Sequence, residues 1–277
     1  MFFGKRFCIS LQIPLKIDVH VVEHCNLNCK GCTHFSPIAK PEYLDIVDFS
    51  NNIKHLTKIE KSIGSIQLLG GEPLLHPRLS EIINVTRKNL SKTNIHIITN
   101  GILLTNEKKL PVDFWETCKK NNVLIRITKY PSVNYDVIER KCIEKEIKYE
   151  WFEDRGTKNR NKGWSFFPLY INGWKHISNR YKFLKLLRCG SFNCLQLVGT
   201  KIYPCSHVAY VRHLNNYFNY DFKVIQKDSV EITKIKNSFA VRKLLFMSTP
   251  FCKYCGYGYK SSHWAQSNKT ADEWIEF

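Results

Sequence analysis

Apolar and polar residues alternate along the first half of the chain in two different periods. Residues 15–23 are largely β-branched and carry Asp18 and His20 on one alternating face, which predicts a buried strand. Residues 47–62 repeat their apolar positions at helical spacing and predict a helix. Further strands are expected at 65–71, 94–101, 123–128 and 147–152, and further helices at 77–90, 107–121 and 133–146. Strands that alternate with helices predict an α/β fold built from parallel βα units.

The chain changes in character near residue 155. From Arg155 to Arg188 it has nine Lys or Arg, seven aromatic residues and no acidic residue. Beyond this segment, residues 194–205 predict a β-hairpin that turns at Gly199. We therefore divide the chain into a core at 1–155, a basic aromatic bridge at 156–188 and a small C-terminal module at 189–277.

The basic aromatic bridge allows three interpretations. Its residues suit a nucleic-acid surface, because cations contact phosphates and aromatic rings stack on bases. They also suit a packed connection between two modules that leaves its charges solvated. The third interpretation is a pocket wall for a phosphate-bearing small substrate. The sequence leaves all three open.

The composition limits the class of protein. Of the 277 residues, 43% are hydrophobic, which supports a folded core and excludes wholesale disorder. No stretch approaches the ~20 consecutive apolar residues of a membrane span, and the N-terminus lacks the apolar region of a signal peptide. We therefore expect a cytoplasmic protein. The net charge of +18 favours polyanions, phosphorylated substrates or an anionic membrane surface, unless it reflects a compositional bias.

The chain has 11 cysteines, and in a reducing compartment this number makes metal or redox chemistry the first interpretation. Cys25, Cys29 and Cys32 lie together directly after the first predicted strand. A tight loop can bring three thiolates to one iron–sulfur cluster, and three ligands for four irons leave one iron open for chemistry. A structural zinc site completed by His24 or His34 is the alternative at this spacing.

A second motif, Gly70-Gly71-Glu72-Pro73, directly follows the second predicted strand. Together the cysteine loop and this motif resemble the radical S-adenosylmethionine (SAM) superfamily, and the resemblance runs from residue 15 to about residue 155. It implies that the three cysteines hold a [4Fe–4S] cluster whose open iron chelates SAM. One electron, from a reducing partner such as flavodoxin or ferredoxin, would then cleave SAM to a 5′-deoxyadenosyl radical that abstracts a substrate hydrogen.

The resemblance also implies cofactor-binding positions. Gly70 and Gly71 would let the backbone approach SAM because they lack a Cβ atom. Glu72 would meet the methionine ammonium of SAM, and Asn100, at the end of the third predicted strand, matches the position of the ribose contact. Arg126 would pair with the SAM carboxylate, because arginine presents a bidentate fork to a carboxylate.

Three further positions bear on this site. Lys129 is an alternative to Arg126 as the partner of the SAM carboxylate. His20 lies on the inner face of the first predicted strand, where it would either face the substrate or be a hydrogen-bonded core residue. Gly31 departs from the superfamily, which usually has an aromatic or bulky residue before the third cysteine. This departure concerns the packing of the adenine and leaves the cluster prediction unchanged.

A second set of cysteines lies in the C-terminal module, at Cys189, Cys194, Cys205, Cys252 and Cys255. Zinc suits their spacing as well as iron does. The arrangement resembles the Twitch module, a shortened SPASM extension that holds an auxiliary [4Fe–4S] cluster after radical SAM cores. On that resemblance we predict Cys189, Cys205, Cys252 and Cys255 as ligands. Cys194 would either replace Cys189 or act as a catalytic, substrate-facing thiol that donates a hydrogen atom.

The sequence therefore predicts an α/β protein with a partial parallel (β/α) barrel, a small auxiliary-cluster module and radical SAM chemistry. The segment at 18–37 resembles small radical SAM proteins of sugar and surface-glycan pathways. The leading substrate is accordingly a sugar or aminocyclitol, including phosphate- or nucleotide-linked forms. We expect dehydrogenation, epimerisation or dehydration at a carbinol carbon.

Two other functions stay open at this point. The first is a radical SAM maturase of a ribosomally made peptide, because auxiliary-cluster modules are also common in such enzymes. No additional leader-peptide-recognition domain is evident at the N-terminus, which counts against it. The second is a zinc-stabilised nucleic-acid-binding module, which predicts zinc without iron and strongly salt-dependent binding. It leaves the glycine-rich motif and the motif around Asn100 unexplained.

Overall fold

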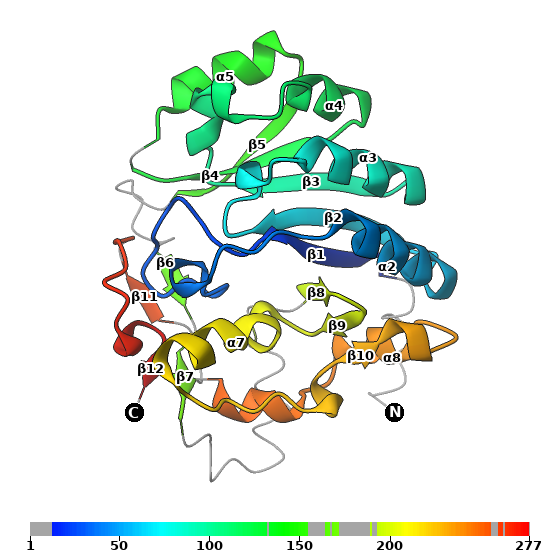
Figure 1. Ribbon diagram of the computed structural model, residues 1–277, viewed down its shortest axis with the longest axis vertical. Helices are drawn as coiled ribbons and strands as arrows, with labels where there is room; N and C mark the ends of the chain where they lie inside the picture. The colour runs from blue at the N-terminus through cyan, green and yellow to red at the C-terminus, as the bar shows by residue number, and fades with distance from the viewer. Residues whose placement is uncertain are drawn as a thin grey trace.

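The main element of the fold is an eight-stranded sheet with the order β10-β9-β8-β1-β2-β3-β4-β5 (Figure 1). The computed structural model describes residues 13–131, 133–154, 164–166, 168–171, 189, 193–255, 260–262 and 264–276. The strands of the main sheet are β1 (Leu15–Val22), β2 (Ile63–Gly70), β3 (Asn94–Thr99), β4 (Leu124–Lys129), β5 (Lys148–Asp154), β8 (Leu195–Val198), β9 (Lys201–Tyr203) and β10 (Val230–Glu231). Two small sheets pair β11 (Lys260–Ser262) with β6 (Trp164–Phe166) and β12 (Ile275–Glu276) with β7 (Leu169–Tyr170).

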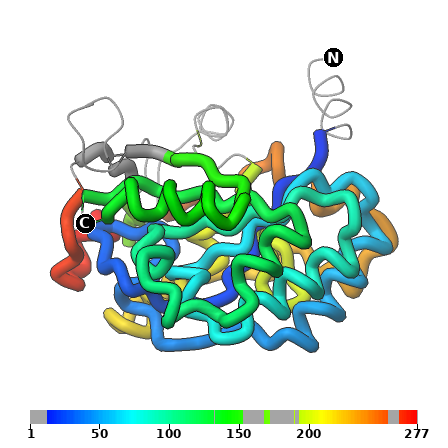
Figure 2. Tube along the Cα trace, turned by 90° about the horizontal axis from the view of Figure 1, so that it is seen from above, coloured from blue at the N-terminus to red at the C-terminus, as the bar shows by residue number. Residues whose placement is uncertain are grey.

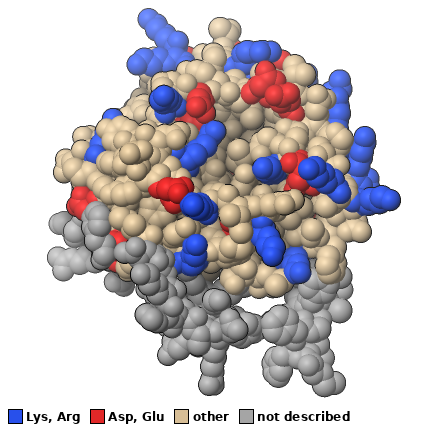
Figure 3. Space-filling view, turned by 60° about the horizontal axis from the view of Figure 1, so that its bottom comes forward, with Lys and Arg blue, Asp and Glu red and all other residues tan. Residues whose placement is uncertain are grey.

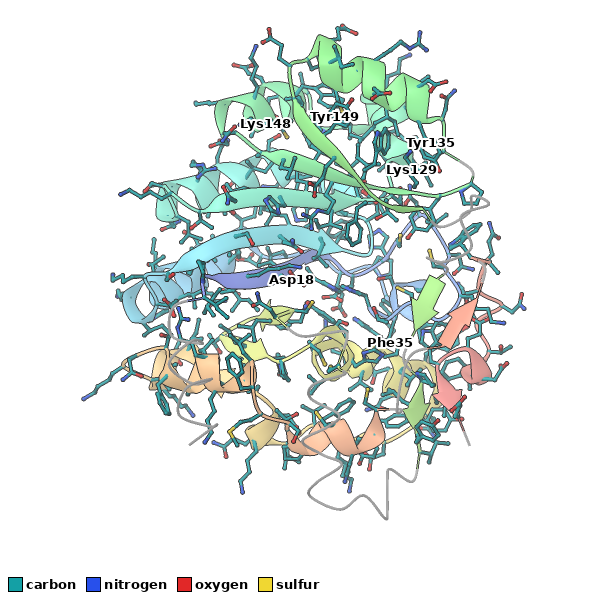
Figure 4. The ribbon with its side chains drawn as sticks, turned by 180° about the vertical axis from the view of Figure 1, so that it is seen from behind. Asp18, Phe35, Lys129, Tyr135, Lys148 and Tyr149 are labelled. Atoms are coloured by element: carbon teal, nitrogen blue, oxygen red, sulfur yellow. The ribbon has the colours of Figure 1, made fainter. Side chains whose placement is uncertain are left out.

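Strands β8, β1, β2, β3, β4 and β5 pair with one another in parallel, in that order, whereas β9 is antiparallel to β8 and to β10. The two edge strands, β10 and β5, do not pair with each other. The connecting helices are α2 (Ile46–Ile59), α3 (Leu79–Asn89), α4 (Phe114–Lys120) and α5 (Tyr135–Glu144). Right-handed crossovers place such helices on one face of a parallel sheet. Helices α2 and α3 accordingly lie in front of the sheet in Figure 1 and behind it in Figure 4. The prediction of an α/β fold with a partial parallel barrel is confirmed.

The two faces of β1 differ in chemistry, and the difference positions the site. Helix α2 buries Phe49, Ile53 and Leu56 along one side, in the same hydrophobic core as the odd-numbered residues of β1. Successive side chains of a strand point to opposite faces. Asp18 and His20 therefore belong to the face opposite helix α2, and both are buried there.

One predicted helix is wrong over its first half. Residues Glu107–Lys109 form a 3₁₀ turn, and helix α4 begins only at Phe114. Pro111 lies between them, and proline both lacks a backbone N–H and disfavours helical conformation in the residue before it. The other strands and helices predicted up to residue 152 begin and end within a few residues of the expected positions.

The C-terminal part of the chain shares the main sheet with the core. The predicted hairpin is confirmed: β8 and β9 are antiparallel and turn at Gly199, whose φ of 55° favours glycine. Strand β8 pairs in parallel with β1, and helices α7 (Ser206–Phe218) and α8 (Phe239–Leu244) follow the hairpin. Most of the predicted bridge at 156–188 lies outside the described residues.

A second hydrophobic core joins the cysteine loop to the C-terminal part. Phe35 and Ile38, just after the loop, are buried with Val208 and Tyr210 of helix α7 and with Trp274 near the C-terminus. Figures 1 and 2 both show the C-terminal segment beside the blue N-terminal segment that carries the loop. The loop is therefore packed from two sides, by the sheet and by the chain's last residues.

Charges of both signs are interspersed on the surface seen in Figure 3, where Lys and Arg lie with Asp and Glu between them. The described part of that face shows no single continuous basic patch. Among the described residues, no helix is both long and apolar enough to cross a membrane.

Candidate active site

The three loop cysteines lie just beyond the carboxyl end of β1. The strand ends at Val22, and the loop passes through Cys25, Cys29 and Cys32 before a 3₁₀ turn at Ser36–Ile38. Cys29 is buried, and the other two are half-buried. Gly31 has a φ of 62°, a left-handed conformation that favours glycine. This conformation explains why a bulky residue does not precede Cys32.

Gly70 and Gly71 bring the end of β2 against the cysteine loop. A Cβ atom on Gly70 would lie 2.1 Å from the carbonyl oxygen of Val22, and one on Gly71 would lie 1.9 Å from that of His24. The N–H of Gly71 donates to the Val22 oxygen at 2.8 Å, and the N–H of Glu72 donates to the His24 oxygen at 3.2 Å. Gly70 is therefore required by its contact with the end of β1, and Gly71 by its contact with the start of the cysteine loop.

Glu72 joins the ends of strands β2 and β3. Its carboxylate is fully buried and accepts hydrogen bonds from the Thr99 hydroxyl at 2.6 Å, the Asn100 N–H at 2.8 Å and the Leu74 N–H at 3.1 Å. Burial raises the pKa of Glu72 to about 7, against the effect of these three donors. The carboxylate also acts on the Cys25 thiol and raises its pKa. Glu72 therefore links the ends of β2 and β3 by hydrogen bonds and also acts electrostatically on Cys25.

Asn100 connects the end of β3 to the cysteine loop. Its side-chain N–H₂ donates to the side-chain oxygen of Asn26 at 2.8 Å and lies 3.7 Å from the Cys25 sulfur. Its side-chain oxygen accepts from the Ile102 N–H at 3.0 Å. The structure thus brings together Glu72, Asn100 and the first loop cysteine, which the sequence assigned to one site.

The C-terminal segment holds the other side of the loop. Ser267 and Asn28 exchange two hydrogen bonds of 2.8 Å, and the Lys30 N–H donates to the Ala265 oxygen at 2.9 Å. The indole N–H of Trp264 donates to the Cys29 sulfur at 3.2 Å, and that of Trp274 donates to the Cys32 oxygen at 2.9 Å. These contacts were not predicted, because no spacing links residues more than 200 positions apart.

The loop cysteines fit an iron–sulfur cluster by the chemistry of their donors. Burial raises the pKa of Cys25 well above its ordinary value, with Glu72, Cys32 and Cys29 acting in the same direction, and burial also raises the pKa of Cys32. The thiolates repel one another when they are deprotonated, and a bound metal cation that replaces the thiol protons relieves this repulsion. Among the described residues, no three His, Cys, Asp or Glu side chains already stand in a metal-binding arrangement.

Arg126 and Lys129 both belong to β4 but have different neighbours. Lys129 ends the strand, and its ammonium lies over the rings of Tyr135 and Trp151, 5.4 and 5.1 Å from their centroids (Figure 4). Arg126 lies three residues earlier and is paired with Glu150 of β5. The predicted contact of either cation with the SAM carboxylate therefore stays a prediction.

His20 belongs to a buried chain of hydrogen bonds. One of its ring nitrogens contacts the ring of His34, and the other lies 3.2 Å from the Glu23 carboxylate, which also meets His213 of helix α7 at 2.8 Å. The ring of Tyr210 stacks on His20 with centroids 3.5 Å apart. Of the two interpretations of His20, the structure supports a hydrogen-bonded core histidine. It also shows that this core joins β1 to helix α7.

In the second set of cysteines, Cys189 acts on the thiols of both Cys205 and Cys194. Burial raises the pKa of Cys205 well above its ordinary value, and Cys252, Cys255 and Cys189 add to the effect, so these four thiols interact. Burial likewise raises the pKa of Cys194 to about 11. The charged groups that act on Cys194 are Asp18, Lys16 and Cys189, and Cys194 does not figure among the thiols that act on Cys205. The ten described cysteines form no disulfide.

Known proteins resemble this chain in its core region. The family model of the radical SAM superfamily matches residues 19–156. Over 104 residues, the chain is 31% identical to GTP 3′,8-cyclase of Chlorobaculum tepidum, a match that covers 36% of this chain and 31% of the relative. It is 30% identical, also over 104 residues, to S-adenosylmethionine-dependent nucleotide dehydratase of Selenomonas ruminantium, covering 36% of this chain and 35% of the relative. The matches span about a third of either relative.

A solved structure resembles the chain over most of its length. The crystal structure of BtrN in complex with AdoMet and 2-DOIA superposes with a TM-score of 0.50 at 16% identity. The superposition covers 88% of this chain and 94% of BtrN. At this identity the likeness shows the fold.

Proposed function

Because residues 19–156 make this chain a member of the radical SAM superfamily, we propose that it is an enzyme acting on a sugar or aminocyclitol. Phosphate- or nucleotide-linked forms are included, and the outcome is dehydrogenation, epimerisation or dehydration. The observation that carries the proposal is the packing of the cysteine loop against Glu72 and Asn100 at the ends of β2 and β3. A zinc-stabilised nucleic-acid-binding module gives no reason for this packing.

Cys25, Cys29 and Cys32 would hold a [4Fe–4S] cluster with one open iron. With SAM bound, that cluster supplies the 5′-deoxyadenosyl radical that abstracts a substrate hydrogen. Glu72 is a fully buried carboxylate whose three hydrogen-bond partners are uncharged donors, so an ammonium group such as that of SAM suits it. Asn100, whose side-chain nitrogen lies 3.7 Å from the Cys25 sulfur, would contact the bound nucleoside.

We further propose that Cys189, Cys205, Cys252 and Cys255 hold an auxiliary [4Fe–4S] cluster, which supplies an electron acceptor. Support comes from the mutual effect of these four thiols on the pKa of Cys205. The donor set alone also suits zinc. An acceptor of this kind favours dehydrogenation, in which the substrate loses an electron and a proton after the hydrogen atom is removed.

Cys194 is proposed as the hydrogen-atom donor for the alternative outcome, epimerisation. Burial raises the pKa of Cys194 to about 11, so its S–H bond is intact at neutral pH. It directly precedes β8, and the carboxylate of Asp18 in the neighbouring strand β1 acts on its thiol. Cys189, one of the four proposed ligands, acts on the same thiol.

The names of two relatives support a nucleotide-linked or otherwise phosphate-bearing substrate. One is a GTP cyclase and the other a nucleotide dehydratase, and each matches this chain over about a third of its own length. The net charge of +18 is consistent with an anionic substrate. The cytoplasm, where flavodoxin or ferredoxin can supply the electron, is the proposed location.

Hydrogen transfer from a labelled substrate tests the proposal. Anaerobically reconstituted enzyme is incubated with SAM, a flavodoxin reducing system and carbon-deuterated UDP-sugars or aminocyclitols. We expect 5′-deoxyadenosine to form faster with one of these compounds and to carry its deuterium, as measured by mass spectrometry. Deuterium taken only from a peptide would support a peptide maturase instead. No 5′-deoxyadenosine under any condition would contradict the enzyme assignment.

A further inference from the structure

Two buried polar side chains meet across the boundary between the core and the C-terminal part. Asp18 of β1 and Gln196 of β8 are register partners in the parallel pair, with exposed fractions of 6% and 1%. The side-chain N–H₂ of Gln196 donates to one Asp18 carboxylate oxygen at 2.9 Å and to the Cys194 carbonyl oxygen at 2.9 Å. These two hydrogen bonds fix the orientation of the Gln196 amide. Its oxygen, Oε1, therefore points away from Asp18 Oδ2 and from the Cys194 carbonyl.

The remaining oxygen of each side chain has no hydrogen-bond partner. Within the described part of the chain, this holds for Oδ1 of Asp18 and for Oε1 of Gln196, both of which are buried. Buried side-chain oxygens in folded proteins nearly always have a partner. Asp18 and Gln196, which are joined by a hydrogen bond, therefore each keep one buried oxygen that can accept a hydrogen bond from a ligand.

The neighbouring side chains extend this polar spot along the sheet. By register, Asp18 stands beside Gln67 of β2, and Gln67 stands beside His96 of β3, so all three share the face opposite helices α2 and α3. His96 Nδ1 and the hydroxyl of Tyr210 are likewise buried without a partner in the described residues. Figure 4 shows Asp18 on β1, at the border between the core strands and the C-terminal part.

The position of Asp18 suits the inner end of a substrate pocket. It lies four residues before the end of β1, or about 13 Å along the strand from the point where the cysteine loop begins. The Asp18 carboxylate acts electrostatically on the thiol of Cys194, the proposed hydrogen-atom donor. The spot therefore lies on the face of the sheet opposite helices α2 and α3, and helix α7 packs on that same face at His20.

We propose that Asp18 and Gln196 form a subsite that anchors a hydroxyl or ammonium group of the substrate. The inference rests on the proposed function and makes it more specific. Two acceptor oxygens attract hydrogen-bond donors and repel a phosphate, so the phosphate of a linked substrate would bind elsewhere. The ligand class is a polyhydroxylated ring, and an amino-bearing ring adds a charge pair with Asp18.

Binding measurements on the reconstituted enzyme with SAM test the subsite. The probes are myo-inositol, 2-deoxystreptamine, UDP-glucose and UDP-glucosamine, and the method is anaerobic calorimetry. We expect wild type to bind at least one of them, and Asp18→Asn and Gln196→Leu to weaken that binding at least tenfold. A preference for the amino compound over its hydroxyl counterpart that disappears in Asp18→Asn assigns an ammonium. An equal loss for both compounds assigns a hydroxyl.

The matched control is Ser80→Ala. Ser80 Oγ is also buried without a partner in the described residues, but it lies on α3, among residues that pack on the helix-covered face. This variant should bind the probes as wild type does. The melting temperature of ligand-free Asp18→Asn should not fall, because the amide keeps an oxygen that accepts from Gln196 and the substitution removes a buried charge. A merely structural pair predicts the reverse, a lower melting temperature with unchanged affinity.

Two results would overturn the subsite: wild type that binds none of the probes, or variants that bind them as tightly as wild type. The formation of 5′-deoxyadenosine by wild type without any sugar reports on the cysteine loop alone. If wild type cleaves SAM but the subsite variants bind normally, the subsite fails and the proposed function stands. If wild type does not cleave SAM, the proposed function fails, whatever the binding measurements show for the subsite.

Discussion

The two cysteine regions of this molecule are built in different ways. Cys25, Cys29 and Cys32 lie within eight residues of one loop, which contacts the ends of two strands and the C-terminal segment. The proposed auxiliary ligands come from several distant segments and meet only through tertiary packing, as at Cys205 before helix α7. A local loop can be recognised by spacing, whereas a dispersed set depends on how the whole C-terminal part folds.

The largest expected effect separates the two regions by function. Cys25→Ala removes a ligand of the proposed open-iron cluster and should reduce 5′-deoxyadenosine formation from SAM to the level of an enzyme-free control. Cys252→Ala removes a ligand of the auxiliary set and should retain SAM cleavage while losing conversion of the substrate. Chromatographic measurement of 5′-deoxyadenosine with and without substrate checks both variants. Equal loss of SAM cleavage in both would show that the two regions do not act separately.

A large effect on stability is expected at Asp18, on the boundary between the regions. Burial raises the pKa of Asp18 from 3.8 to about 6, with Lys16, Gln196 and Arg126 acting against it. Between these two values the folded state binds more protons than the unfolded state, so stability falls as pH rises through this window. The difference corresponds to about 3 kcal/mol, present as a cost above pH 6 and absent below pH 4.

Asp18→Asn tests this pH dependence. The variant should lose the decline in unfolding free energy between pH 4 and 6, and should be more stable than wild type at pH 7. Urea denaturation at a series of pH values measures both quantities. Parallel curves for the two proteins across this window would show that Asp18 does not titrate there.

Gly71→Ala should have an intermediate effect on the first region. The new Cβ would lie 1.9 Å from the His24 carbonyl oxygen, so the cysteine loop must move away from β2. We expect a loss of about 2 kcal/mol in unfolding free energy and weaker cluster assembly. The control is Gly199→Ala in the β8–β9 turn, where a Cβ has open space and only the φ of 55° is unfavourable. If the control loses as much stability as Gly71→Ala, the contact with His24 does not carry the effect.

Trp264→Phe should have the smallest effect and tests the contact between the C-terminal segment and the loop. It removes the hydrogen bond from the indole N–H to the Cys29 sulfur and should cost about 1 kcal/mol in unfolding free energy. Loss of that donor should also make the reduction potential of the reconstituted cluster more negative, as followed by EPR redox titration. In the control, Trp115→Phe, the lost N–H is buried without a partner among the described residues, so only the cost of the smaller ring is expected, without the cost of a lost hydrogen bond. A potential unchanged in Trp264→Phe would exclude a direct effect of this indole.

The sequence predicted those parts of the fold that depend on local pattern. Alternation and helical spacing located the strands and helices of the core, and Pro111 explains the one helix that begins late. The motif order also joined Glu72 and Asn100 to the cysteine loop correctly, because the carboxyl ends of neighbouring parallel strands meet at one edge.

Contacts between distant segments were not predictable. The position of Trp264 beside Cys29 depends on the return of the chain after 235 residues, and no local spacing encodes it. The pairing of Arg126 with Glu150 depends on strand register, which the sequence did not define. The meeting of Asp18 and Gln196 likewise follows from β8 joining the free edge of β1.

Iron and sulfide analysis with EPR tests the central claim most directly, namely that the two cysteine regions hold separate clusters. Anaerobically purified wild type is compared with a variant in which Cys25, Cys29 and Cys32 are all replaced by alanine, each with and without SAM. We predict about eight irons in wild type, about four in the variant and a SAM-dependent spectral change in wild type alone. About four irons that all disappear in the variant, or zinc without iron after reconstitution, would contradict the account.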